Sequence, residues 1–128
     1  MQNPTFQNPG FPNSYFLALK TVVDQLQAEL TPGIRQRLQT YVLEHLPSAG
    51  LSAEHHQKIE HWLKGGIAST IGNLPADVAG AVLHYFEVGL NEYLGPEAAP
   101  QTLQRSFERA RQRLAAVNID PFALLVPA

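Results

Sequence analysis

The sequence predicts an all-α fold, a single-domain bundle of about five helices. Apolar residues recur at alternating steps of three and four through most of residues 14–118, and no segment shows the strict alternation of a half-buried strand. Residues that suit helix ends separate the periodic stretches. A chain of 128 residues is long enough to bury one hydrophobic core without metals or disulfides.

Residues 1–13 precede the bundle and form an extended tail rich in proline and asparagine. The tail contains a short repeat, Gln2 to Phe6 followed by Gln7 to Phe11, in which each Asn-Pro pair favours a turn. We expect Phe6 and Phe11 either to dock in grooves or to stay mobile.

The first predicted helix ends before Thr31-Pro32, where the second predicted helix begins. The first begins at Ser14 and buries one side, composed of Phe16, Leu19, Val23, Leu26 and Leu30. Thr31 is placed as an N-cap with Pro32 at the first helical position, where its missing N–H is no loss. The second helix then runs to about Leu46 and buries Ile34, Leu38, Tyr41 and Val42.

The third predicted helix begins after Ser52, which is placed as its N-cap. Its inner side holds Ile59, Trp62, Leu63 and Ile67. Gly65-Gly66 is either the end of this helix or a point where another helix crosses closely.

The fourth predicted helix opens at Asn73-Leu74-Pro75 and is apolar on several sides, so we expect it to be surrounded. Its small residues, Ala79, Gly80 and Ala81, would let a neighbour approach closely. Gly95-Pro96 ends it, and a fifth helix runs from near Pro100 to about Asn118. Residues 119–128 form an apolar tail that we expect to pack on the bundle of residues 14–118.

Composition excludes several kinds of site and partner. The absence of cysteine excludes disulfides, thiolate metal sites and cysteine nucleophiles. A net charge of −2 makes binding of nucleic acid through a whole face unexpected. Charged residues make up 16% of the chain, below the roughly 25% usual in soluble domains, and we therefore expect part of the surface to be covered by a partner or by another copy of the chain, as in a homodimer.

The start of the chain lacks the features of a secretory signal. A secretory signal has a positively charged region and then an apolar region. The N-terminal residues hold no Lys or Arg before Lys20 and no uninterrupted apolar run, so we expect a cytoplasmic protein. The most apolar window, residues 66–94, is interrupted by polar and proline residues, and we expect no membrane span.

The strongest electrostatic feature is a line of arginines on the last predicted helix. Arg105, Arg109 and Arg113 recur at steps of four and therefore lie along one side of it; we call them the arginine strip. The strip is a candidate binding site for an anionic partner, such as an acidic protein, a phosphate-bearing ligand, RNA or a lipid headgroup. The alternatives are a solvated helix face and weak binding of nucleic acid.

A second candidate site is a pocket between the third and fourth predicted helices. Trp62, Tyr85 and Phe86 would line it, and His84 and Glu87, three residues apart, would serve as a titratable pair. Alternatively, His84 and Glu87 mark the side of the helix that reaches solvent, or bond to a neighbouring helix.

No motif indicates catalysis, a metal or a cofactor. The histidines lack the spacing of a helical metal site, and no phosphate-binding loop or hydrolase nucleophile elbow occurs. Asn3-Pro4-Thr5-Phe6 and Asn8-Pro9-Gly10-Phe11 resemble the short Asn-Pro-x-Phe turn peptides that adaptor domains bind. Asp120-Pro121-Phe122 resembles another adaptor-binding peptide. Alternatively, these phenylalanines fill gaps between helices.

Together these observations favour a small non-enzymatic helical protein that acts through protein contacts, as an adaptor or an assembly subunit that self-associates. The arginine strip and the phenylalanines Phe6 and Phe11 are its predicted partner-binding residues. The first alternative is a ligand-binding or catalytic bundle with a pocket around His84 and Glu87. The second is weak nucleic-acid binding through the strip.

Overall fold

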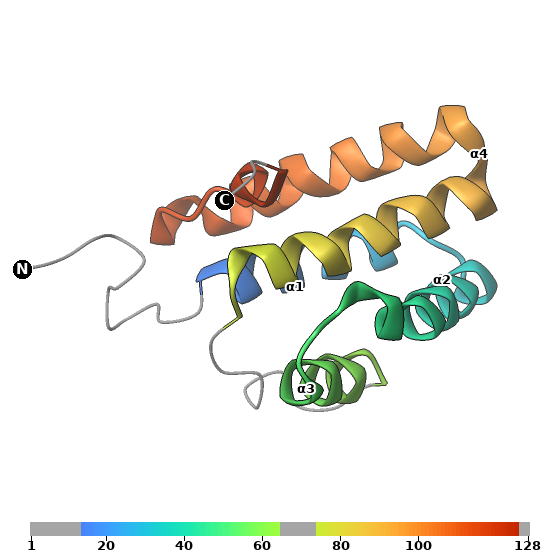
Figure 1. Cartoon of the computed structure of the whole chain (residues 1–128). Helices are drawn as coiled ribbons and strands as arrows, with labels where there is room; N and C mark the ends of the chain where they lie inside the picture. The colour runs from blue at the N-terminus through green and yellow to red at the C-terminus, as the bar shows by residue number, and fades with distance from the viewer. Residues whose placement is uncertain (1–13, 65–73, 126–128) are drawn as a thin grey trace, which may run out of the picture.

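The computed structural model describes residues 14–64 and 74–125. Within them the chain is all-α, as predicted, with no strand, and the helices pack into one bundle (Figure 1). The α-helices are α1 (Ser14–Ala28), α2 (Pro32–His45), α3 (Ala53–Leu63) and α4 (Ala76–Leu114). Three short 3-10 turns accompany them, η2 (Leu46–Ala49), η4 (Ala115–Val117) and η5 (Pro121–Leu125).

The described residues form four α-helices rather than the predicted five, because α4 includes both of the last two. A kink at Gly95 (φ 91, ψ 164) nevertheless divides α4 into a first arm, residues 76–94, and a second arm, residues 96–114. The two arms run back along each other as a hairpin (Figure 1). The second arm begins at once after Gly95, not near Pro100, because Pro96 has the preferred residue type for a helix start.

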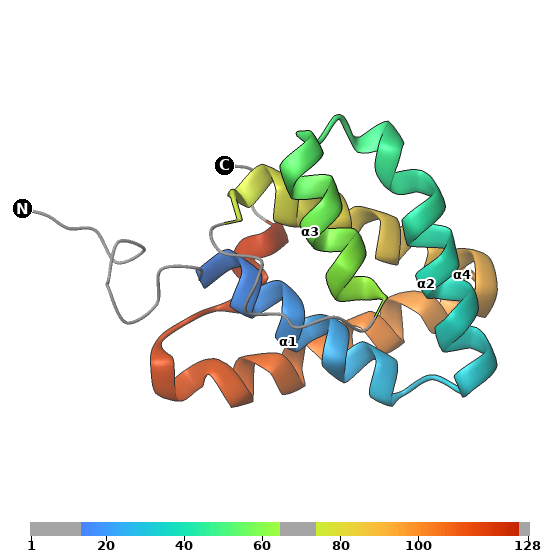
Figure 2. The ribbon, with the colours of Figure 1, turned by 90° about the horizontal axis from the view of Figure 1, so that it is seen from below.

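The core lies where α1 and α2 pack on α4, and α2 meets the first arm at Gly89. All five residues that the period of α1 predicts to be inside are buried: Phe16, Leu19, Val23, Leu26 and Leu30. On α4, Val82 and Phe86 are fully buried in the first arm, and Ala110 in the second. Figure 2 shows α2 and α3 on the opposite side of α1 from the second arm.

A close crossing of two helices lies at Gly89, a position that the sequence does not single out. A methyl group at Gly89 would stand 2.7 Å from Tyr41 Cδ1 and 2.8 Å from Leu38 Cδ1, both on α2. Gly89 therefore lets α2 approach the first arm more closely than any other residue type would.

The N-caps of α2 and α3 are made by the residues that the sequence indicates. Thr31 Oγ1 accepts a hydrogen bond from the N–H of Ile34 (3.3 Å), and Ser52 Oγ accepts one from the N–H of His55 (3.2 Å). α3 ends at Leu63, so the predicted break at Gly65-Gly66 and the residue Ile67 lie outside the described residues. Trp62 anchors α3 by packing edge-on against Phe16 of α1, with 5.0 Å between ring centroids.

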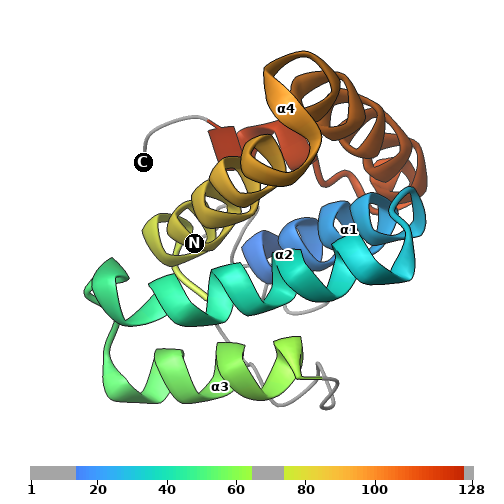
Figure 3. The same cartoon turned by 90° about the vertical axis from the view of Figure 1, so that its right-hand side faces the viewer.

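After α4 the chain turns back and places η5 against α4 and α1. Asn118, in the left-handed conformation (φ 58), makes the turn. Figure 3 shows η5 between the two arms of α4. Residues 1–13, with Phe6 and Phe11, lie outside the described residues.

No helix in the described part of the chain is both long and apolar enough to cross a membrane.

Candidate functional site

A groove of about 520 Å³ lies between the two arms of α4. The first arm contributes His84, Glu87, Val88, Leu90 and Asn91 to its lining, and the second arm contributes Ala99, Pro100, Leu103, Gln104 and Phe107. The volume falls within the roughly 300–1,000 Å³ typical of ligand sites. The kink at Gly95 creates the groove, because it folds one helix into two arms whose facing sides diverge.

The groove has an apolar floor and a polar rim. Leu90, Leu103 and Phe107 are buried and form the floor together with Ala99, whereas the polar lining residues His84, Glu87, Asn91 and Gln104 are exposed. Val88 also lies on the rim and is 39% exposed, the largest exposure of any large hydrophobic residue among the described ones. Such a rim around apolar surface is typical of sites that bury part of a partner.

The chain's own C-terminal segment occupies the space next to the groove. The ring of Phe122 in η5 lies 5.1 Å from the ring of Phe107, and Phe107 also lines the groove. On the first arm, a methyl group at Gly80 would stand 3.9 Å from the carbonyl oxygen of Leu124, an ordinary contact. The cleft between the arms is therefore filled by η5 near Gly80 and open beside His84 and Val88.

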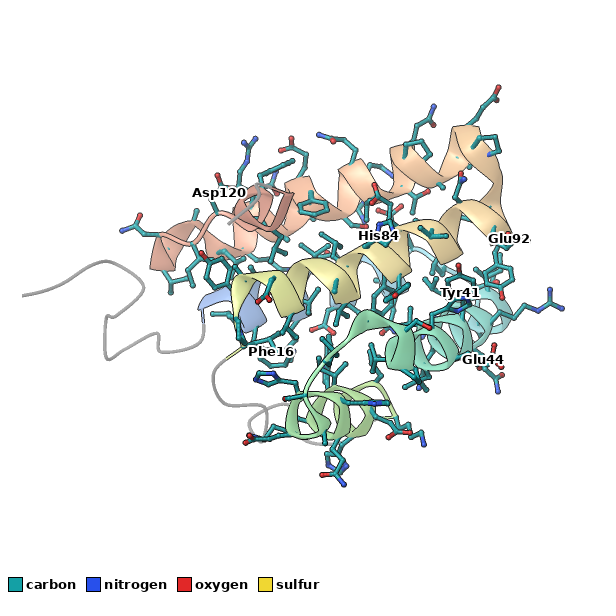
Figure 4. All side chains as sticks on the ribbon, in the orientation of Figure 1. Phe16, Tyr41, Glu44, His84, Glu92 and Asp120 are labelled. Atoms are coloured by element: carbon teal, nitrogen blue, oxygen red, sulfur yellow. The ribbon has the colours of Figure 1, made fainter. Side chains whose placement is uncertain are left out.

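The structure brings together two of the predicted pocket residues and separates the others. His84 and Glu87 line the groove, and Figure 4 shows His84 on the side of the first arm that faces the second. Trp62 is 9% exposed and belongs to the core, as does Phe86. The groove therefore lies between the two arms of α4 rather than between α3 and α4, where the sequence places the pocket.

Tyr85 belongs to an aromatic cluster on the side of the first arm that faces α2. The ring of His45 stacks on that of Tyr41, with 4.0 Å between centroids, and lies 5.9 Å from the ring of Tyr85. His45 Nδ1–H donates to the carbonyl oxygen of Tyr41 (2.8 Å). Tyr93 completes the cluster by an edge-on contact with Tyr41. This half-buried cluster joins α2 to α4, so we assign Tyr85 a packing role.

Two arginines of the strip form ion pairs with a glutamate of the same chain. Arg105 Nε and Arg109 Nη1 donate to the two carboxylate oxygens of Glu29, at 2.9 Å and 3.3 Å. The Glu29 side chain is only 11% exposed, while those of Arg105 and Arg109 are 51% and 53% exposed. We call these three residues the Glu29 clamp. It joins the end of α1 to the second arm and leaves one positive charge uncompensated.

The neighbouring arginines differ from the clamp and from each other. Arg111 pairs with Glu108 (2.7 Å) and places its guanidinium carbon 5.3 Å from the centre of the Phe122 ring. Arg113 is exposed and has no ion pair among the described residues. The strip is thus divided between a structural pair and one free cation.

The remaining titratable groups form no further site in the described part of the chain. Lys58 lowers the pKa of Glu54, and Lys64 lowers that of Glu60, in each case by a hydrogen-bonded ion pair of 3.0 Å on the surface of α3. No group of three or more His, Cys, Asp or Glu residues stands close enough together to hold a metal ion in the part of the chain that the structure describes.

The sequence pattern did not identify several residues that the geometry makes important. Val88, Leu103 and Phe107 line the groove but are not among the site residues that the sequence predicts. Glu29 carried no signal, because its partners lie 76 and 80 residues away.

Comparison with known proteins adds no relative: no family model, curated protein or solved structure matches this chain. The function is therefore inferred from the site alone.

Proposed function

We propose that this protein is a non-enzymatic helical interaction module that binds an apolar segment of a protein partner in the groove between the arms of α4. The observation that supports the proposal is the groove itself, with its apolar floor of Leu90, Leu103 and Phe107 and the exposed Val88 at its rim. Burial of an apolar side chain there would release water from both surfaces.

The occupied end of the cleft indicates the kind of segment that fits. There η5 inserts an apolar turn between the arms, and Phe122 packs on Phe107. A partner segment with an aromatic or aliphatic anchor would extend the same packing along the cleft. The polar rim would accept hydrogen bonds from its backbone, as in other peptide grooves.

The arginine strip is the weaker candidate for the partner site. Because Glu29 holds Arg105 and Arg109, an acidic partner or a nucleic acid would have to compete with an existing ion pair. Of the three strip arginines, only Arg113 has no ion pair among the described residues, and strong binding to nucleic acid rests on many phosphate contacts.

A second candidate function, binding of a small molecule, is supported by His84 and Glu87. Both line the groove beside its apolar floor, so a ligand with an apolar body and a hydrogen-bonding end would find partners for both parts. Loss of binding after His84→Ala or Glu87→Gln would distinguish such a ligand from a peptide held mainly by apolar contacts.

The proposed function is tested by selecting peptides from a displayed random library with the full chain and measuring their affinity for two variants. Val88→Glu places a charge on the groove rim, and Ala98→Glu places the same charge on an exposed position of α4 outside the groove. We expect Val88→Glu to weaken binding by about tenfold or more, because its carboxylate would be buried without a partner.

Ala98→Glu should leave the affinity near that of the wild type. A library that yields no binder would contradict the proposal. So would peptides that bind both variants equally well.

A further inference from the structure

The tail at the start of this chain and the segment that already fills part of the cleft share a residue pattern. At the start of η5 the pattern is Asp120-Pro121-Phe122, with Asp120 directly before the first residue of η5. In the tail it is Asn3-Pro4-Thr5-Phe6 and, five residues later, Asn8-Pro9-Gly10-Phe11. Each combines an Asp or Asn, a proline directly after it and a phenylalanine one or two residues further on.

The structure shows how the C-terminal copy of this pattern packs. Asp120 Oδ1 accepts a hydrogen bond from the N–H of Phe122 (3.0 Å), which closes a small turn that presents the aromatic ring. The ring then lies against Phe107, and the guanidinium of Arg111 lies over it. Asn can close a turn of this kind, because its side-chain oxygen is an equivalent acceptor. In the tail the residue two positions after Asn is Thr5 or Gly10, so the phenylalanine follows one residue later.

We propose that the N-terminal segment, residues 1–13, docks in the groove between the arms of α4 of its own chain, with Phe6 as the anchor beside Val88 and Leu103. The inference rests on the proposed function, since it treats the groove as a docking site for an apolar segment. It goes further by naming an occupant that the chain itself supplies and that an external partner would have to displace.

The composition of the segment suits the groove. Residues 2–13 contain no Asp, Glu, Lys, Arg or His, so insertion would bury no charged side chain. The groove offers four polar rim residues that can bond the exposed backbone of an extended segment: His84, Glu87, Asn91 and Gln104.

The segment is also long enough. Phe6 lies eight positions before Ser14, and an extended chain of eight residue steps spans about 28 Å. The 15 residues of α1 span about 22 Å. The far end of α1 already reaches the second arm, where Glu29 pairs with Arg105, two residues from the groove residue Leu103. The groove therefore lies within reach of Phe6.

A spin label tests the proposal in the full chain. Because the chain has no cysteine, Gln7→Cys gives a single site for a nitroxide, and methyl NMR then reports which side chains lie near it. We expect the methyl signals of Val88, Leu90 and Leu103 to lose most of their intensity. Those of Leu63 and Val42, away from the groove, should keep it.

Two companion variants separate docking from general proximity. In the labelled chain, Phe6→Ala with Phe11→Ala should restore the groove signals, whereas Thr5→Ala should not. A mixture of isotope-labelled chain and unlabelled, nitroxide-bearing chain should show no broadening. Broadening in that mixture would mean that the segment comes from a second copy and would overturn the intramolecular proposal.

Uniform intensities across the groove would also overturn it. The proposed function would survive that result if library peptides still bound in a way that Val88→Glu abolished. If both inferences hold, the Phe6→Ala, Phe11→Ala double variant should bind library peptides more tightly than the wild type. Its N-terminal segment would no longer compete with the peptide for the groove.

Discussion

The two sides of the first arm of α4 differ in how completely they are covered. On one side, Val82 and Phe86 are fully buried, and α2 approaches Gly89 so closely that an added methyl group would stand 2.7 Å from Tyr41 Cδ1. On the other, only two residues from Phe86, Val88 is 39% exposed beside His84 and Glu87, at the rim of the groove. One helix thus carries a packed face and an apolar face that the bundle leaves open.

The difference separates residues that hold the fold from residues that are available to a partner. The packed face is covered by helices distant in sequence, while the open face is covered by η5 only near Gly80. The polar rim of His84, Glu87, Asn91 and Gln104 lowers the cost of leaving the open face in water. Substitutions on the two faces should therefore affect different properties.

The largest expected effect compares Phe86→Ala with Val88→Ala. Phe86 is 0% exposed, so its truncation should lower the free energy of unfolding by about 3–5 kcal/mol through lost burial and a cavity. Val88→Ala should change it by no more than about 0.5 kcal/mol. Urea unfolding followed by circular dichroism measures both, and similar losses in the two variants would show that the open face is in fact packed.

The next comparison is between two glycines of the first arm. Gly89→Ala would place a methyl group 2.7 Å from the ring of Tyr41 and should cost about 1–3 kcal/mol through forced repacking. Gly80→Ala meets only an ordinary contact with Leu124 and should gain up to about 1 kcal/mol from helix propensity. Thermal unfolding gives the sign, and stabilisation by Gly89→Ala would contradict the close crossing of α2.

A smaller effect is expected from the Glu29 clamp. Glu29→Gln removes the charge that holds Arg105 and Arg109, and because both arginines are about half exposed, we expect a loss of about 1 kcal/mol. Glu92→Gln, an exposed position on α4, is the matched control and should be nearly neutral. If the two variants are equally stable at low salt, the clamp has no structural role and its arginines are free to bind.

The smallest effect concerns the exposed ion pairs of α3. Lys58 and Lys64 lower the pKa of Glu54 and Glu60 below the ordinary value of 4.5, so the pairs add stability above that pH and lose it as the pH falls through the lowered pKa. Replacing both lysines with Met should slightly reduce the fall in melting temperature between about pH 6 and about pH 3. A variant that loses more stability than the wild type on acidification would contradict this assignment.

Local patterns predicted the helices well, because helix formation depends on spacing and on residues at the ends. The inner residues of α1 and the caps at Thr31 and Ser52 are where the pattern places them. Gly95-Pro96 was also recognised as a break. The break is a kink, and the second arm follows it immediately. Pro100 lies early in that arm and removes one backbone donor without ending the helix.

The groove could not be predicted, because it depends on how the arms diverge and on where η5 ends. His84 and Glu87 were recognised as unusual on an apolar helix, but Trp62 and Phe86 were placed with them because helical spacing does not show which neighbour covers which face. The Glu29 clamp could not be predicted for the same reason. The spacing of the arginines along their helix does not show that Glu29, which directly follows α1, lies beside Arg105.

The most direct test of the central claim is methyl NMR of the full chain titrated with a peptide selected from the library. Saturable shifts confined to Val88, Leu90 and Leu103, with the signals of Val22 and Val42 unchanged, are the predicted result. Shifts centred on the exposed surface of α3 or on the residues around Arg113, with the groove signals unmoved, would contradict the assignment of the groove as the partner site.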